Sequence, residues 1–309
     1  MHLKSITGLG SVDHEAPDRR TDRPERPQHP LDEREFTMPG TLHTPDVAAE
    51  DTALLDATVA AVREAGAALR GRFADVVRYG TRDELMHALA ANDDTALDLL
   101  RPRLTQARPD AGWVEEELDG GALPAGEWWV VDPAEGNVNH LHALPEWAVT
   151  ATLVRDNQPV LTAVHLPLTG ETYTALRGAG THLDGRPLHV SPTEDLALGI
   201  VATSQARPDE DDEVVRRVGS SITAMLSDAL VVRTAVPATL HLVNVAAGRI
   251  DAFWQFAGAR ADLLPGALLV TEAGGRVSDA EGRPWTPLSE GFLAAAPGVH
   301  AQAVATLSR

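Results

Sequence analysis

Two carboxylates lie close together just after the most apolar, strand-like run of this chain. The run Trp128–Val131 is followed at once by Asp132-Pro-Ala-Glu-Gly136. Because proline donates no hydrogen bond to a sheet, we expect the strand to end at Asp132, and the glycine then permits a tight turn. The carboxylates of Asp132 and Glu135 and the carbonyl of Ala134 would then surround one small volume. Oxygen ligands of this kind suit Mg2+, and a cation held this way is typical of sites that handle phosphate.

Two further acidic groups occur elsewhere in the chain. Glu115-Glu116-Glu117 follows Trp113-Val114, which looks like a strand that delivers the acids to a sheet edge, although glutamate runs are also typical of solvated loops. Asp262 begins an apolar helical pattern that ends in Gly274-Gly275, where an aspartate is an ordinary N-cap residue. A metal-ligating aspartate needs the same exposed place at a helix start. The patterns alone leave both alternatives open for each group.

The net charge of the chain bears on which classes of ligand the protein can bind. The 309 residues carry a formal charge of -19, so no basic surface can dominate and we expect no nucleic-acid partner. A phosphorylated substrate remains compatible with this charge, because bound divalent cations reverse the local potential. The chain has no cysteine, which excludes disulfides, thiol nucleophiles and cysteine-ligated metals and fits a reducing cytoplasm.

Several common motifs are missing from the sequence. No P-loop, no Gly-x-Gly-x-x-Gly and no Gly-x-Ser-x-Gly occurs, so nucleotide-dependent transfer and serine-hydrolase chemistry have no support. No apolar run approaches the ~18 residues of a membrane span, and the N-terminus has no secretory apolar region. We therefore expect a soluble, cytoplasmic protein without a membrane partner.

The chain changes character near residue 45. Residues 1–45 are rich in proline and charged residues and are predicted to be disordered. Residues 46–309 are predicted to form one domain, in which helices and an antiparallel sheet (46–192) precede an α/β half (193–309), and a layered α+β fold follows. The predicted helices cover 48–73, 94–106, 213–226, 238–247 and 263–273. The predicted strands cover 113–114, 128–131, 148–154, 159–166, 171–176, 200–202, 230–232 and 292–296.

The three acidic motifs, in this order, resemble the inositol monophosphatase family of Mg2+-dependent phosphomonoesterases. Glu115-Glu116-Glu117 resembles the family's Gly-Glu-Glu loop. Asp132-Pro-Ala-Glu-Gly-Asn-Val-Asn139 resembles its Asp-Pro-x-Asp-Gly-Thr-x-Asn turn, and Asp262 with Glu272-Ala-Gly-Gly275 resembles its last motif. The resemblance covers the chain from about residue 50 to the C-terminus. It implies a layered α-β-α-β-α sandwich of the inositol monophosphatase and fructose-1,6-bisphosphatase type.

The resemblance also implies roles for individual residues. The implied ligands of Mg2+ all offer oxygen and are Glu116, Asp132, the carbonyl of Ala134, Glu135 and Asp262. The residues implied to act on the attacking water are Glu116, Asp93 and Asn137. The residues implied to bind substrate are Gly136 and Asn137, through amides at a helix start, together with Ala238 and Gln255.

The chain departs from the family pattern at several of these places. Glu135 replaces the second aspartate of the turn, and Asn137 replaces a threonine whose hydroxyl helps to position the attacking water. Ala261 replaces the tryptophan that precedes the last aspartate, and Gln255 replaces an acid that contacts substrate hydroxyls in inositol-hydrolysing members. His87-Ala-Leu-Ala90 stands where the family has Asp-Leu-Val-Thr, which speaks against a third metal site. These changes predict altered activity.

The expected function is therefore a Mg2+-dependent phosphatase that acts on a small phosphomonoester, such as an inositol, sugar or polyol phosphate. One alternative is a bisphosphate nucleotidase, which the same fold supports. Another is a family member that has lost catalysis and serves as a binding or regulatory protein. The expected partners are a small phosphorylated metabolite and, as is common in the family, a second copy of the chain in a homodimer.

Overall fold

The computed structural model describes residues 49–309 except 74–77, 115–121, 206–209, 257–259 and 288. These residues belong to a compact unit that spans Phe36–Arg309. The segment 1–45 and Glu116 lie outside the described residues, so the predicted disorder and the proposed domain boundary stay predictions. Among the described helices, none is both long enough and apolar enough to span a bilayer.

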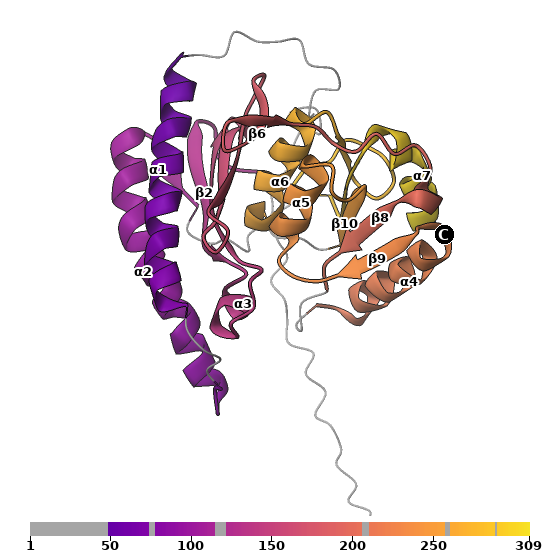
Figure 1. The fold of residues 1–309 in the computed structure, drawn as a ribbon, viewed down its shortest axis with the longest axis horizontal. Helices are drawn as coiled ribbons and strands as arrows, with labels where there is room; N and C mark the ends of the chain where they lie inside the picture. The colour runs from indigo at the N-terminus through magenta and orange to yellow at the C-terminus, as the bar shows by residue number, and fades with distance from the viewer. Residues whose placement is uncertain (1–48, 74–77, 115–121, 206–209, 257–259, 288) are drawn as a thin grey trace, which may run out of the picture. The chain divides into compact units, whose positions relative to one another are not determined.

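The described elements form five layers, alternately helical and sheet (Figure 1). The first sheet lies between the pair α1 and α2 and the pair α5 and α6, and the second sheet separates α5 and α6 from α4 and α7. The α-helices are α1 (Ala49–Arg72), α2 (Arg82–Ala107), α3 (Asn137–Leu141), α4 (Asp212–Asp228), α5 (Ala238–Ala246), α6 (Arg260–Glu272) and α7 (Pro297–Leu307). This order confirms the predicted α-β-α-β-α fold.

The first sheet runs in chain order and is antiparallel except for its first pair. Strands β1 and β2 are parallel, and each later strand pairs antiparallel with the one before it. Its strands are β1 (Gly112–Trp113), β2 (Glu127–Glu135), β3 (Ala148–Arg155), β4 (Gln158–Leu166), β5 (Glu171–Leu176), β6 (Gly180–Leu183) and β7 (Arg186–Leu188). Strands β3 and β4 are buried almost throughout, because helices cover both faces of the sheet.

The predicted end of strand β2 is wrong. Strand β2 continues beyond Asp132 to Glu135, with an irregularity in its pairing to β3 between these two residues. Pairing resumes at Glu135, which lies opposite Ala148. Pro133 falls within the irregular stretch, where a residue without an N–H group breaks no ladder bond.

The predicted start of the second helix is also wrong, by three turns. Helix α2 begins at Arg82 rather than Asp94, with Thr81 as its N-cap. The Thr81 hydroxyl accepts a hydrogen bond from the Glu84 N–H at 3.2 Å, while the Glu84 carboxylate accepts one from the Gly80 N–H at 2.8 Å. This reciprocal capping begins the helix in a polar stretch where apolar periodicity gives no signal. His87 consequently lies within α2.

The second sheet is mixed and has the strand order β11-β12-β10-β8-β9. Its strands are β8 (Ile200–Thr203), β9 (Val231–Thr234), β10 (Ala252–Phe256), β11 (Arg276–Ser278) and β12 (Gly291–Ala295), and a 3-10 helix (Leu196–Leu198) precedes β8. The sequence patterns missed α7, β6, β7, β10 and β11, whereas the helix start that the resemblance implies at Gly136 and Asn137 is present as α3. Every residue of β10 is buried, so the alternation that normally reveals a strand is absent there.

Candidate metal centre

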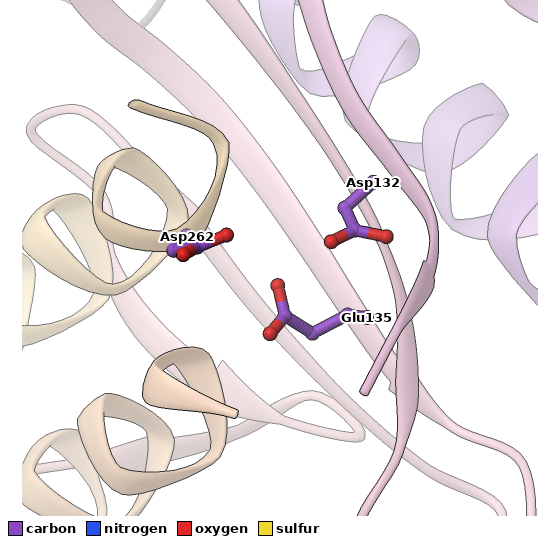
Figure 2. A group of neighbouring side chains, drawn as sticks. All are labelled: Asp132, Glu135 and Asp262. Atoms are coloured by element: carbon purple, nitrogen blue, oxygen red, sulfur yellow. The ribbon is translucent and has the colours of Figure 1, made fainter. Parts of the chain in front are cut away.

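Three carboxylates converge at the junction of the first sheet and the central helices. Asp132 and Glu135 come from β2 and Asp262 from the first turn of α6, and Figure 2 shows the three side chains pointing toward one another. One oxygen from each carboxylate lies within 4.8 Å of the others. Glu135 is only 2% exposed, whereas Asp132 and Asp262 are partly exposed. The structure therefore brings together three of the sequence-predicted ligands.

The irregular end of β2 sets the directions of its two acids. The Ala134 N–H donates to the Asp132 carboxylate at 3.0 Å, within the irregular stretch between Asp132 and Glu135. Gly136 follows with a φ of 81°, a left-handed conformation that favours glycine. A Cβ atom at Gly136 would lie 2.7 Å from the Glu146 carbonyl oxygen. The glycine is therefore required both by its backbone conformation and by the close approach of another segment.

Thr239, on α5, connects the two sides of the cluster. Its hydroxyl lies 3.1 Å from a Glu135 carboxylate oxygen and 2.9 Å from the Asp262 carbonyl oxygen. The longer side chain of Glu135 thus ends against a buried hydroxyl that is 104 residues away in the chain. Sequence reasoning missed Thr239, because nothing in the neighbouring residues distinguishes it from any other threonine on an apolar helix.

The electrostatics of the cluster favour a bound cation. Burial raises the pKa of Asp132, and the charge of Asp262 raises it further. Burial also raises the pKa of Glu135, with the charges of Asp132 and Asp262 adding to the effect. These acids therefore resist ionising together unless positive charge lies among them. An all-oxygen set of close carboxylates supplies the ligands that a hard divalent cation requires, so the residues fit a metal of this class.

Asp93 and Asn137 form a second group beside this cluster. Asn137, the first residue of α3, donates from Nδ2 to the Asp93 carboxylate at 2.7 Å. Burial raises the pKa of Asp93 to about 6, although the Asn137 hydrogen bond acts in the opposite direction. The charge of Asp93 also raises the pKa of Asp132. The two sequence-predicted residues are therefore in contact, and the carboxyl group titrates close to neutral pH.

The remaining predicted residues have different environments. Gln255, at the end of β10, is buried and accepts a hydrogen bond from the Ser204 hydroxyl at 2.7 Å. Ala238 is the first residue of α5 and its side chain is buried. Glu116 and the Ala261 side chain lie outside the described residues. The ligand role of the Ala134 carbonyl and the substrate roles of these residues stay predictions.

Comparison with known proteins assigns the chain to a family. The model of the "Inositol monophosphatase family" matches residues 50–309. An "Inositol-1-monophosphatase" from Rhizobium meliloti is 33% identical over 237 residues, which cover 75% of this chain and 87% of the relative. A "Nus factor SuhB" from Pseudomonas aeruginosa is 32% identical over 211 residues, which cover 67% of this chain and 78% of the relative.

Solved structures agree with this assignment. The extragenic suppressor protein suhB from Bartonella henselae is 26% identical with a TM-score of 0.70, and the match covers 83% of this chain and 100% of that chain. An inositol monophosphatase from Anabaena has a TM-score of 0.72 at 23% identity, with 84% of this chain and 97% of that chain covered. At that identity the second likeness supports the fold alone.

Proposed function

The chain belongs to the inositol monophosphatase family, and on that premise we propose that it hydrolyses a small phosphomonoester with the help of Mg2+. The observation that carries the proposal is the convergence of Asp132, Glu135 and Asp262 within 4.8 Å of one another. In the proposed site these acids would hold the metal together with the Ala134 carbonyl and Glu116. Mg2+ bound there would supply positive charge to the phosphoryl oxygens and acidify a bound water.

The reaction that we propose is an in-line displacement at phosphorus. The oxygen of a water molecule bonds to phosphorus, the ester P–O bond breaks, and the leaving oxygen takes a proton from solvent water, so that an alcohol and inorganic phosphate result. Asp93 accepts the proton that the water loses, because its pKa of about 6 leaves it ionised at neutral pH yet basic enough to act. Asn137 holds Asp93 through the 2.7 Å hydrogen bond. The amides of Gly136 and Asn137 bind phosphate oxygens.

The substrate alcohol would lie against neutral groups. Gln255 is uncharged, and its carboxamide oxygen is occupied by the Ser204 hydroxyl, so its NH2 group is the end offered to substrate. We assign Gln255 and the backbone of Ala238 to the alcohol part of a sugar or polyol phosphate. A binding or regulatory role is the second candidate, because the Pseudomonas aeruginosa relative is named as a Nus factor rather than as a phosphatase.

The first experiment measures phosphate release from a panel of sugar, polyol and nucleotide phosphomonoesters, with and without Mg2+. We expect Mg2+-dependent turnover by the wild type and a loss of at least about 100-fold in kcat for Asp132→Asn, which removes one ligand charge. The matched control is Asp98→Asn on the exposed surface of α2, which changes the same charge and should retain full activity.

Thermal unfolding provides a second readout that does not depend on turnover. In metal-free buffer Asp132→Asn should raise Tm, because the substitution removes repulsion among the carboxylates. Adding Mg2+ should raise the Tm of the wild type and of Asp98→Asn, but hardly that of Asp132→Asn. Metal-dependent stabilisation without release of phosphate from any ester would reject the phosphatase and favour the binding role.

A further inference from the structure

A polar network that is buried at two of its three residues lies behind Asn137 and is not used by the proposed reaction. It consists of Arg72 at the end of α1, Asn92 on α2 and His140 on α3, and we call these three residues the Asn92 network. Asn92 is fully buried and His140 is 3% exposed. Buried carboxamides and imidazoles need hydrogen-bond partners, so the partners of each atom can be assigned in turn.

The hydrogen bonds of Asn92 have one consistent assignment. Its Oδ1 accepts from Arg72 Nε at 2.9 Å, so its NH2 group faces Asn137 Oδ1 at 2.8 Å and His140 Nδ1 at 3.0 Å. Because both neighbours receive a hydrogen from Asn92, His140 Nδ1 is an acceptor. The ring hydrogen is then on Nε2, which donates to the Leu69 carbonyl at 2.9 Å. Burial lowers the pKa of His140 and so favours this neutral form.

This assignment determines which way the Asn137 carboxamide points. Since Asn137 Oδ1 receives the hydrogen from Asn92, the Asn137 NH2 group is directed at Asp93 Oδ1 and at the Leu89 carbonyl, at 2.7 and 3.0 Å. Both hydrogens of the carboxamide are thereby taken by protein acceptors. In the opposite orientation, its oxygen would face the Asp93 carboxylate, and two acceptors would repel each other.

We propose that Asn92 is a positioning residue, which, together with Arg72 and His140, orients the Asn137 carboxamide so that it holds Asp93 for the attack of water. The inference rests on the proposed function and deepens it. It makes Asp93 the group that contacts the water, while Asn137 acts through Asp93 rather than on the water itself.

The test is the isosteric substitution Asn92→Asp. The aspartate still accepts from Arg72 but cannot donate, so Asn137 loses the hydrogen bond that determines its orientation. With the best ester of the panel we expect kcat to fall about 10- to 100-fold, since displacements near 1 Å at a reacting group cost about that much. KM should change less than about twofold, because no substrate contact is removed. The matched control is Asn244→Asp on α5, where Asn244 donates to the Leu240 carbonyl outside the site, and it should retain wild-type kcat.

The ¹⁵N NMR spectrum of the histidine rings gives a readout that needs no activity. In the wild type we expect His140 to be neutral with its hydrogen on Nε2. In Asn92→Asp we expect a second hydrogen on Nδ1, facing the new carboxylate, while Nε2 still donates to the Leu69 carbonyl. A wild-type ring with hydrogen on Nδ1 would overturn the assignment whatever the activity. An active wild type with an unchanged kcat in Asn92→Asp would also overturn the proposal.

The two proposals fail in different ways. If the wild type releases phosphate from no ester, the proposed hydrolysis and the positioning role in it both fall, and the NMR spectrum still decides whether the network orients Asn137. If the wild type is active, the ratio of kcat values between Asn92→Asp and Asn244→Asp decides the positioning role alone.

Discussion

At the scale of single residues, the site consists of acids whose neighbours oppose their ionisation. Asp132 and Glu135 have raised pKa values through burial and mutual repulsion, and Asp93 shows the same effect with a pKa of about 6. Perturbed carboxyl groups that lie together in this way are typical of functional sites, because a protein gains no stability from them. The glutamate that replaces the family's aspartate is accommodated by Thr239, whose hydroxyl meets its longer side chain.

The titration of Asp93 predicts the pH dependence of activity. If ionised Asp93 accepts the proton of water, kcat/KM with saturating Mg2+ rises with pH through the pKa of Asp93 and then levels off; this pKa is about 6 in the metal-free chain and is lower with the cation bound. The measurement is a pH–rate profile of the wild type and of Asp93→Asn, which should keep little activity and lack this inflection. The same inflection in the wild type and in Asp93→Asn would exclude Asp93 as the base.

The raised pKa of Asp93 also makes the stability of the metal-free protein depend on pH. The folded pKa of Asp93 lies above its ordinary value of 3.8, so the folded chain holds this proton when the unfolded chain has released it. The contribution of Asp93 to stability is therefore present below about pH 4 and is lost as the pH rises through about 6. Between about pH 4 and pH 6 the free energy of unfolding, measured in urea, should therefore decrease less in Asp93→Asn than in the wild type.

At the scale of elements, the site depends on the close packing of α5 against α6. Thr239 lies on the first of these helices and Asp262 on the second, and the helices meet where Gly266 faces the fully buried Leu242. A Cβ atom at Gly266 would lie 2.2 Å from Leu242 Cδ1. The glycine is therefore present because the helices approach closely, in spite of its poor helix propensity.

A double-mutant cycle tests this packing. Gly266→Ala should lower the free energy of unfolding by about 1–3 kcal/mol through overpacking, and Leu242→Ala by about 2–5 kcal/mol through a cavity. In the double variant the Cβ atom of residue 242 remains 2.3 Å from the added methyl group, but the rest of the Leu242 side chain is gone, so part of the overpacking is relieved and the two costs should sum to more than the observed loss. Urea unfolding measures all three variants, and strictly additive costs would contradict the contact.

At the scale of the whole molecule, two features bear on folding and on the site: the net charge and the segment 1–45. A net charge of -19 adds general repulsion to the local repulsion at the acidic cluster, and a bound divalent cation relieves both. The described elements account for the layers and for every residue of the acidic cluster, and they begin at Ala49. Because residues 1–45 are rich in proline and charged residues, we propose that they contribute to neither folding nor the site.

Truncation tests that proposal. A chain that begins at residue 46 should keep its Tm within about 1 °C and its kcat unchanged, because Asp51 still pairs with Arg155 at 2.8 Å. A chain that begins at residue 56 is the contrasting variant. It loses that ion pair and the buried Leu54, so its free energy of unfolding should fall by about 2–5 kcal/mol. Equal losses in both truncations would show that the first segment supports the fold.

The sequence by itself determined those features that lie within short stretches of chain. The apolar strand, the acids at 132 and 135 and the glycine after them are neighbours, so their chemistry is visible in the order of residues. The same holds for Asp262, although it lies within the first turn of α6 and not at the N-cap position that the pattern predicts. The resemblance to a family supplied the order of the layers, and the structure confirms it.

Only the tertiary structure decided the partners of these residues. Thr239 meets Glu135 across 104 positions, and Asn92 reaches Asn137 across 45, separations at which periodicity and spacing carry no information. The continuation of β2 past Pro133 likewise depends on its pairing with β3, which the sequence of β2 alone does not contain. Local patterns therefore identify which groups can do chemistry, whereas the packing of distant segments decides how each group is oriented and charged.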